Sequence, residues 1–363
     1  SSGRYDIVVH TDSGSAHPIT TTGGVYPSSG GQRVSDFSIE PPFGDYNVQK
    51  TFENVKSNYY NKSATFTLSG PSGSISKTVS GNGNAFFERL KPGTYTLTET
   101  GASGFVTNPP QTVTVIAGRR GSSAPTTTIN NVAKRGNFNL QKDTGDNYIS
   151  GKNKNYSLAG AQYELILKND NSLKYTLTTN EQGQASLQNI ERGEYTLREV
   201  SAPRGYALNT QGEEVYVMNE TNGKQTRDNP RYDPVVLTLE KADKERNALN
   251  ANQYGPQGNA SLVGAVFTLT LYEENNLTEA QIKAGQGTKL WSVDITTKDV
   301  NGKAVAKTSD KSYLSNYVPY KTDAASLDNI FDVAQGRLKI AGGTFAVVEK
   351  SAPTGYLVDG VQF

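Results

Sequence analysis

The segment Tyr195-Thr-Leu-Arg-Glu199-Val-Ser-Ala-Pro-Arg-Gly-Tyr206 decides the fold, because related segments precede and follow it. They are Tyr95-Thr-Leu-Thr-Glu99-Thr-Gly-Ala-Ser-Gly-Phe105 and Phe345-Ala-Val-Val-Glu349-Lys-Ser-Ala-Pro-Thr-Gly-Tyr356. Each alternates with period two and then reaches a glycine turn, which predicts a half-buried β-strand. Because side chains alternate faces along a strand, Glu199 shares the apolar face of Tyr195 and Leu197. Each copy therefore places a carboxylate on the face predicted to line the core.

A buried carboxylate needs a partner, because an unpaired charge in a core is costly. Lysine is the candidate, since each copy opens with a strand that ends in lysine: Tyr46-Asn-Val-Gln-Lys50, Phe138-Asn-Leu-Gln-Lys142 and Leu237-Thr-Leu-Glu-Lys241. The same alternation places each lysine on the apolar face of its strand. The sequence therefore predicts three buried pairs, Lys50 with Glu99, Lys142 with Glu199, and Lys241 with Glu349.

The repeat also predicts the domain organisation. Between lysine and glutamate, each copy has a further apolar strand and a strand that begins at glycine (Gly83, Gly183 and Gly336). Many short strands with turn residues between them are typical of antiparallel sandwiches, so we predict an all-β protein of tandem immunoglobulin-like sandwiches. The predicted parts are an N-terminal segment at 1–45, interpreted as the tail of a preceding domain, and domains at 46–133, 134–231 and 232–363.

The third copy differs from the others in length. Its spacing from Lys241 to Glu349 is about twice the spacing in the other copies, which predicts a partly helical insertion at about 273–335. Residues 276–283 have the pattern of a short helix with Asn276 or Thr278 as its cap, and Trp291 follows. Such an insertion either recognises a ligand or packs as a lid that extends the core.

Composition excludes several classes of function. The chain has 363 residues, with 36 Lys and Arg against 35 Asp and Glu, so its charge indicates neither nucleic acid nor an anionic surface as a partner. It has no cysteine and no long apolar run, so we expect no disulfide, no thiolate metal site and no membrane span in this fragment. His10 and His17 are its two histidines, both in the irregular N-terminal segment, which argues against a hydrolase. We expect no cofactor and no metal, because Thr11 occupies the first acidic position of the one stretch that resembles a metal-binding turn.

A third polar side chain accompanies the first two pairs. On the strand that ends the first copy, Asn131 shares a face with Ile129, so its amide is predicted to face the core. In the second copy the matching position falls at Asn229, and Asn219 is the competing candidate. Lysine, asparagine and glutamate together allow a self-catalysed amide bond, because burial favours the neutral amine and a carboxyl group can relay protons as ammonia leaves. The alternative is a hydrogen-bonded polar triad without a bond.

These segments resemble the collagen-adhesin B-type (Cna-B, prealbumin-like) domains of Gram-positive surface proteins, above all those of sortase-assembled pilins, where the glutamate segment is called the E box. The similarity covers about 46–363. It implies inverse-immunoglobulin sandwiches with intramolecular Lys–Asn isopeptide bonds and a catalytic acid. Carried over by position, it implies a bond between Lys50 and Asn131 with Glu99, a bond between Lys142 and Asn229 with Glu199, and Lys241 with Glu349.

The chain departs from this pattern in three places. The third domain is expected to lack its last strand and its acceptor, because no asparagine follows Glu349. Ser28, in Val25-Tyr-Pro-Ser28, stands where the pilin motif has its linking lysine, and no Leu-Pro-x-Thr-Gly sorting motif is present. An ancillary subunit, a tip subunit or an adhesin stalk therefore fits better than a pilus backbone subunit.

The functional prediction is a structural and adhesive pilus subunit that forms a rigid, isopeptide-clamped rod or stalk, and no enzyme beyond its own bond formation. The alternative is a surface adhesin for a matrix protein or glycan, with its site in the 273–335 insertion. The resemblance implies other pilus subunits joined by sortase and the peptidoglycan cell wall as partners. It also implies an extracellular, wall-anchored location at the cell surface.

Overall fold

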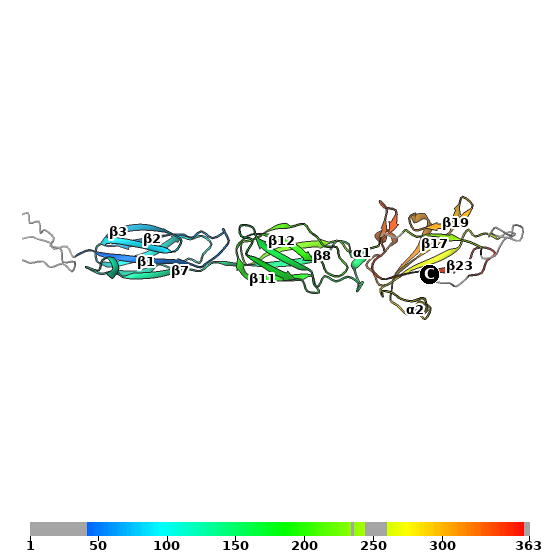
Figure 1. Cartoon of the computed structure of the whole chain (residues 1–363), viewed down its shortest axis with the longest axis horizontal. Helices are drawn as coiled ribbons and strands as arrows, with labels where there is room; N and C mark the ends of the chain where they lie inside the picture. Colours follow the sequence, from blue (N-terminus) through cyan, green and yellow to red (C-terminus); the bar gives the residue numbers. More distant parts are fainter. Residues whose placement is uncertain (1–41, 234–235, 244–259, 359–363) are drawn as a thin grey trace, which may run out of the picture. The chain divides into compact units, whose positions relative to one another are not determined.

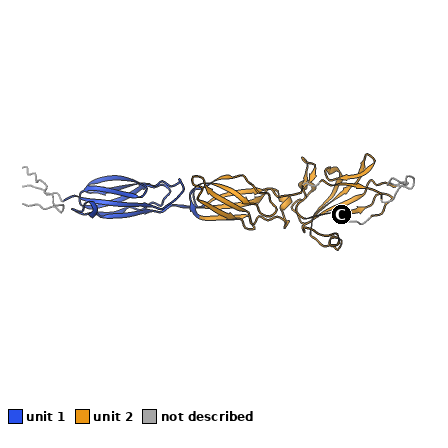
Figure 2. Ribbon diagram, in the orientation of Figure 1, with its two compact units in different colours: residues 1–136, 189–194, 216–220 blue, residues 137–188, 195–215, 221–363 orange. Residues whose placement is uncertain are grey.

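The computed structural model describes residues 42–233, 236–243 and 260–358 (Figure 1). The predictions made for Thr11, Ser28 and the two histidines lie outside these ranges. The predicted all-β class is confirmed, since strands form several sheets and helices are few and short. The chain divides into two compact units (Figure 2): unit 1 comprises residues 1–136, 189–194 and 216–220, and unit 2 comprises the remainder.

The first sandwich lies in unit 1. Its smaller sheet has the order β4-β1-β7, from β4 (Gly83–Leu90), β1 (Gly44–Phe52) and β7 (Thr126–Asn131). Its larger sheet has the order β3-β2-β5-β6, from β3 (Gly73–Ser80), β2 (Ser63–Gly70), β5 (Gly93–Gly101) and β6 (Gln111–Val115), and η1 (Gly121–Ser123) precedes β7. Strand β1 pairs antiparallel with β4 and parallel with β7. Alternating apolar residues of both sheets, among them Phe66, Leu68 and Phe87, fill the core.

The second sandwich repeats this arrangement. One sheet has the order β11-β8-β14, from β11 (Gln184–Glu191), β8 (Arg135–Thr144) and β14 (Asn222–Asp228), with β14 parallel to β8. The other has the order β10-β9-β12-β13, from β10 (Lys174–Thr178), β9 (Gln162–Leu167), β12 (Gly193–Ser201) and β13 (Glu213–Val217). The short helix α1 (Asn147–Ser150) follows β8, and the Asp146 carboxylate caps it by accepting from Tyr148 N.

The third sandwich, in unit 2, has sheets of order β15-β19-β18 and β20-β17-β16-β23. The strands of the first sheet are β15 (Thr238–Lys241), β19 (Lys303–Lys307) and β18 (Lys298–Val300). Those of the second are β20 (Leu314–Pro319), β17 (Lys289–Thr296), β16 (Val266–Tyr272) and β23 (Thr344–Ser351). Smaller elements are α2 (Glu279–Lys283), η2 (Lys311–Tyr313), α3 (Leu327–Ile330), β21 (Phe331–Asp332) and β22 (Arg337–Leu338).

The structure changes the interpretation of the 273–335 segment. Strands β17, β18, β19 and β20 all lie within it, so most of the segment completes the sandwich instead of standing outside it. The antiparallel partner of β15 is β19, and the stretch that begins at Gly336 contributes the short strand β22. The helical parts of the segment are α2, α3 and the 3-10 turn η2, and α2 has the predicted Thr278 cap, which accepts from Gln281 N. Sequence spacing could not separate an insertion from substituted sandwich strands, because both lengthen the chain equally.

Candidate functional site

The first predicted site brings three polar side chains together inside the core of unit 1. Lys50 lies on β1, Glu99 on β5 and Asn131 on β7. The Nζ atom of Lys50 is 3.3 Å from Glu99 Oε1, and Asn131 Nδ2 donates to the same oxygen at 3.0 Å. Lys50 is completely buried and Asn131 is 1% exposed. One carboxylate oxygen therefore lies between the amine and the amide that an amide bond would join.

Strand register explains this meeting. In the parallel pair of β1 and β7, Lys50 is level with Ile129 in the strand register, which means that the two residues are direct neighbours across the strands, and Phe52 is level with Asn131 in the same way. Lys50 and Asn131 are therefore diagonal neighbours on the inner face, within reach of a long side chain. Glu99 approaches from the opposite sheet. Because Lys50 Nζ also donates to the carbonyl oxygens of Thr51 and Ile129, the ammonium group stays inside the sandwich.

Asn108 is a fourth member that the sequence reasoning missed. Its Nδ2 donates to Glu99 Oε2 at 2.8 Å and also to Asn131 Oδ1. It thus orients the glutamate and polarises the carbonyl group of Asn131. In the second copy, Asn209 N donates to Glu199 Oε2 at 2.8 Å. Both asparagines lie three residues beyond the aromatic residue that ends the glutamate segment, Phe105 or Tyr206, which is the signal that could have identified them.

Burial also changes the acid–base behaviour of the first lysine. Desolvation lowers the pKa of Lys50, and its attraction to Glu99 offsets only part of this effect. The neutral amine is the nucleophilic form of lysine. The site therefore favours the form of Lys50 that can attack a carbonyl carbon.

The second site contains an aspartate where asparagine was predicted. Lys142 Nζ donates to Glu199 Oε1 at 2.9 Å and to Asp228 Oδ2. Asp228 is 3% exposed, whereas Asn229 and Asn219 both have exposed side chains. The placement of Asn229 beside Lys142 is therefore wrong. The reason is register: Thr226 is level with Lys142 and Asp228 with Thr144, so even-numbered residues of β14 face the core.

Tyr163 distinguishes the second site from the first. Glu199 is level with Tyr163 in β9, and Glu99 is level with Phe66 in β2, so the two residues occupy matching positions. The hydroxyl group of Tyr163 accepts from Lys142 Nζ at 2.9 Å. Burial lowers the pKa of Lys142, but its hydrogen bonds to Asp228, Tyr163 and Glu199 outweigh burial and leave that pKa raised. Burial also raises the pKa of Asp228, which favours its neutral carboxyl form.

The third predicted pair is present, and no strand among the described residues faces it. Lys241 Nζ lies 2.8 Å from Glu349 Oε1, and the Lys241 side chain is 17% exposed. Strands β1 and β8 each have a parallel neighbour that carries the third side chain of their site. In the described part of the chain, β15 pairs only with β19. Lys241 is the most exposed of the three lysines, and no strand of the described residues covers this edge of β15.

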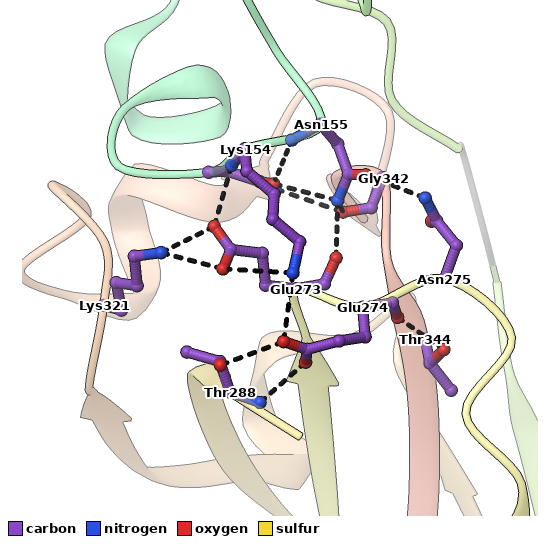
Figure 3. A network of polar contacts seen from close by, with 10 residues as sticks. Lys154, Asn155, Glu273, Glu274, Asn275, Thr288, Lys321, Gly342 and Thr344 are labelled. Carbon is purple, nitrogen blue, oxygen red and sulfur yellow. Dashed lines mark hydrogen bonds and ion pairs between the residues drawn. The ribbon is translucent and has the colours of Figure 1, made fainter.

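A polar network in unit 2 joins the second and third sandwiches (Figure 3). The buried carboxylate of Glu273 accepts from Lys154 N at 2.7 Å and from Lys321 Nζ at 2.7 and 2.8 Å. Asn155 Nδ2 donates to Glu273 O at 2.7 Å and to Gly342 O at 2.9 Å. Beside it, Glu274 accepts from Thr288 N, which lowers its pKa to about 2. The loop that contains Lys154 and Asn155 is thus bound through both side-chain and backbone groups.

Tyrosine hydroxyl groups complete the connections between successive repeats. Tyr156 donates to Arg231 O at 2.5 Å and accepts from Gly342 N at 3.0 Å. Within unit 1, Tyr60 donates to Lys134 O at 2.7 Å and accepts from Arg192 N at 2.8 Å. In both places the hydroxyl group joins a linker carbonyl to the turn that precedes a glutamate strand. This contact is therefore a repeated feature of the chain.

Comparison with known proteins supports the fold. Residues 149–230 match the model of the SpaA prealbumin-like fold domain. The Bacillus anthracis TIE protein is similar in structure, with a TM-score of 0.53 and 20% identity over 89% of this chain and 47% of that one. The chain therefore spans about half the length of that protein. No curated protein is similar enough to count as a match.

Two pilus proteins are also among the similar structures. A streptococcal ancillary pilin has a TM-score of 0.29 and 14% identity, over 88% of this chain and 94% of that one. A C-terminal fragment of the pilus adhesin SpaC from Lactobacillus rhamnosus GG has a TM-score of 0.36 and 14% identity, over 52% of this chain and 98% of that one. These TM-scores are too low to carry an argument.

Among the described residues, no helix has the length and apolar character that a membrane span requires, and no acid or histidine cluster could hold a metal ion.

Proposed function

We propose that this chain is a structural and adhesive subunit of a cell-surface pilus, whose sandwiches are clamped by amide bonds that they form themselves. The observation that carries the proposal is the burial of Lys50 and Asn131 around one oxygen of Glu99. A buried ion pair alone is a weak source of stability, because desolvation offsets its attraction. A geometry suited to bond formation gives this polar core a function.

In the first sandwich, the reaction joins Lys50 to Asn131. Glu99 takes a proton from the Lys50 ammonium group, and the neutral Nζ attacks Cγ of Asn131. Asn108 stabilises the negative charge that develops on Asn131 Oδ1, because its Nδ2 donates to that atom. The proton held by Glu99 passes to the leaving nitrogen, and Glu99 takes in turn one of the two protons that remain on Nζ. The bond between Cγ and Nδ2 breaks, and ammonia leaves. The product is a neutral amide beside Glu99.

In the second sandwich, the reaction joins Lys142 to Asp228 and releases water. Glu199 accepts the proton from Lys142, and Nζ attacks Cγ of the neutral Asp228 carboxyl group. The hydroxyl oxygen of Asp228 keeps its own proton, takes one of the two protons that remain on Nζ, and leaves as water. The raised pKa of Asp228 supports this step, because a neutral carboxyl group is a better electrophile than a carboxylate.

The strands that these bonds join support a mechanical role. The first bond links β1, the first strand of its sandwich, to β7, the last, and the second bond links β8 to β14. A force that pulls on the two ends of a sandwich would act on these strands. A covalent link between them carries that force without unfolding, as expected of a rigid rod or stalk. At the third site, Lys241 and Glu349 would react with an acceptor on a strand added to the open edge of β15.

The partners and location belong to the same proposal. Other pilus subunits joined by sortase, a peptidoglycan anchor and an extracellular position fit the prealbumin-like match at 149–230. The chain then has no enzymatic activity beyond its own bond formation. The alternative, an adhesin with its site at 273–335, is less well supported, because Trp291 is 2% exposed and packs near Tyr317 and Phe345.

Intact mass of the whole chain tests the proposal. We expect a mass below the sequence value by one ammonia and one water. After digestion, a cross-linked peptide should contain Lys50 with Asn131, and another should contain Lys142 with Asp228. A mass equal to the sequence value, with all four residues recovered in linear peptides, would reject the amide bonds.

A further inference from the structure

The outer face of the sheet β11-β8-β14 is hollowed. The hollow has a volume of about 680 Å³, and its polar lining includes Asn139, Gln141, Gln184, Ser186 and Gln225. This volume falls within the range of about 300–1,000 Å³ that is typical of small-molecule sites. All of these residues belong to unit 2, and most of their side chains are exposed to solvent. The hollow is separate from Lys142 and Asp228, which face the core.

The matching face of the first sandwich bears the same kinds of residue, but there the side chains are hydrogen-bonded to one another. There, Asn47 Nδ2 donates to Asn84 Oδ1 at 3.2 Å and to Thr126 Oγ1 at 3.4 Å. Thr128 donates to Gln49 Oε1 at 3.2 Å. These side chains are therefore bonded to one another across the strands, although Asn47 Oδ1 is buried without a hydrogen-bond partner. They correspond in the repeat to the lining amides of the second sandwich: Asn47 to Asn139, Gln49 to Gln141, and Asn84 to Gln184.

Two smaller residues open the face of the second sandwich. In the first sandwich, Asn47 is level with Phe86 on one side and Thr126 on the other. The second sandwich has Ser186 and Gly223 at the corresponding positions. As a result, the side-chain amides of Asn139, Gln184 and Gln225 make no hydrogen bond to another residue in the described part of the chain. Gln141 is held by bonds to the carbonyl oxygens of Lys142 and Gln182.

The lining defines the chemistry of a ligand. Each amide offers a donor and an acceptor side by side, which matches a pair of neighbouring hydroxyl groups. The residues that line the hollow include no carboxylate, and their single lysine, Lys224, is paired with Glu213 at 2.5 Å. The charges of the lining therefore favour neither a cationic nor an anionic ligand. We propose that this hollow binds a neutral carbohydrate.

A peptide strand fits the hollow less well. Extended peptides bind to a sheet by adding to an open edge, where backbone groups are unpaired. The hollow instead lies over β8, the central strand, whose backbone is paired on both sides.

The lining of the hollow has no aromatic ring to stack on a sugar. We therefore expect weak binding, with a dissociation constant on the order of 1 mM for one short oligosaccharide.

Titration of the whole, labelled chain with neutral oligosaccharides tests this site. The probes are chitotriose, cellotriose, maltotriose and lactose. Binding is monitored through the side-chain amide resonances at sugar concentrations up to about 50 mM. We expect at least one sugar to shift the resonances of Asn139, Gln184 and Gln225. The substitutions Ser186→Phe and Gly223→Thr, which copy the first sandwich, should each weaken binding at least tenfold. Asn47→Ala, on the matching face of the first sandwich, should leave binding unchanged.

Several outcomes would overturn the proposal. These are no shift of the three amides with any probe, shifts that persist in Ser186→Phe, or preferential binding of an Asn- and Gln-rich peptide. Because Gly223→Thr brings a new Cβ within 3.3 Å of Asn139 O, its thermal unfolding is compared with that of the parent chain. The exposed substitution Gln225→Ala provides a second loss-of-binding test that does not alter the backbone.

Discussion

Lys142 lies beside Asp228, two residues beyond its level partner Thr226 on the parallel strand β14. Lys50 and Asn131 have the same relationship, since Ile129 is level with Lys50 on β7. The diagonal position therefore marks the proposed acceptor in the first two sandwiches, although one proposed acceptor is an amide and the other a carboxyl group. The following predictions test this relationship and the contacts around it.

Substitutions at Asp228 should change the mass of the chain in a defined way. Asp228→Asn keeps an electrophile at the diagonal position, so the chain should lose two ammonia molecules in place of one ammonia and one water. Asp228→Ala should lose only the ammonia of the first site. Asn229→Ala is the matched control and should leave the mass deficit unchanged, because Asn229 is exposed. Loss of the second cross-link in Asn229→Ala would instead restore Asn229 as the acceptor.

The unreacted first site should be stabilised by alkaline pH. Asn131→Ala cannot form the bond and keeps Lys50 buried near Glu99. Because the pKa of Lys50 is lowered in the folded state, the unfolded chain binds more protons as pH approaches 10.5, and the free energy of unfolding should rise with pH. Urea unfolding at stepped alkaline pH measures this dependence. The double variant Lys50→Met with Asn131→Ala is the control, and an equal slope in both variants would exclude Lys50 as the cause.

Removal of Glu99 should also block the bond in the first sandwich. Glu99→Ala takes away the proton relay and leaves the amine of Lys50 buried without its charged partner. We expect a loss of about 3–5 kcal/mol in the free energy of unfolding, together with new cleavage by trypsin. Glu88→Ala, at an exposed position of the same sandwich, should change neither property. Unchanged trypsin resistance in Glu99→Ala would argue against a covalent clamp.

Glu273 should stabilise the contact with the loop that contains Lys154. Glu273→Ala leaves Lys154 N without its acceptor, which costs about 1–3 kcal/mol when the group stays buried. Burial raises the pKa of Glu273, but Lys321 and Lys154 N outweigh it and leave that pKa lowered. This stabilisation is therefore present above the unfolded carboxyl pKa and is lost as pH falls through the folded pKa. Urea unfolding measures both effects, and Glu279→Ala on exposed α2 is the control. Equal stability of the two variants at neutral pH would contradict the role of Glu273.

Tyr156 should contribute through its hydroxyl group. Tyr156→Phe keeps the ring but removes the bonds to Arg231 O and Gly342 N, at a cost of about 1–3 kcal/mol. Tyr148→Phe is the matched control, because Tyr148 is 45% exposed. Chemical denaturation of both variants measures the difference. An effect in Tyr156→Phe no larger than that in Tyr148→Phe would show that the hydroxyl contacts are dispensable.

Periodicity predicted the elements on which these sites depend. Alternation alone placed Lys50, Glu99 and Asn131 on inner faces, and the repeat aligned the lysine with the glutamate in every copy. Alternation works because a strand has a period of two, so one face follows directly from the pattern. It fails at the ends of strands: Asn229 and Asp228 are adjacent in sequence, and only pairing with β8 determines which of them faces inward.

Local sequence thus determined the class of fold, the strands and the lysine–glutamate pairs, because each follows from the order of polar and apolar residues along one strand. Tertiary structure decided the placement of Asp228 beside Lys142, the supporting side chains of Asn108 and Tyr163, and the strands within 273–335. These features depend on the register between strands and on loops that return to the core, and neither is encoded in the period of a single segment. The hollow over β8 was also decided by tertiary structure, since Ser186 and Gly223 become neighbours of Asn139 only when β11 and β14 flank β8.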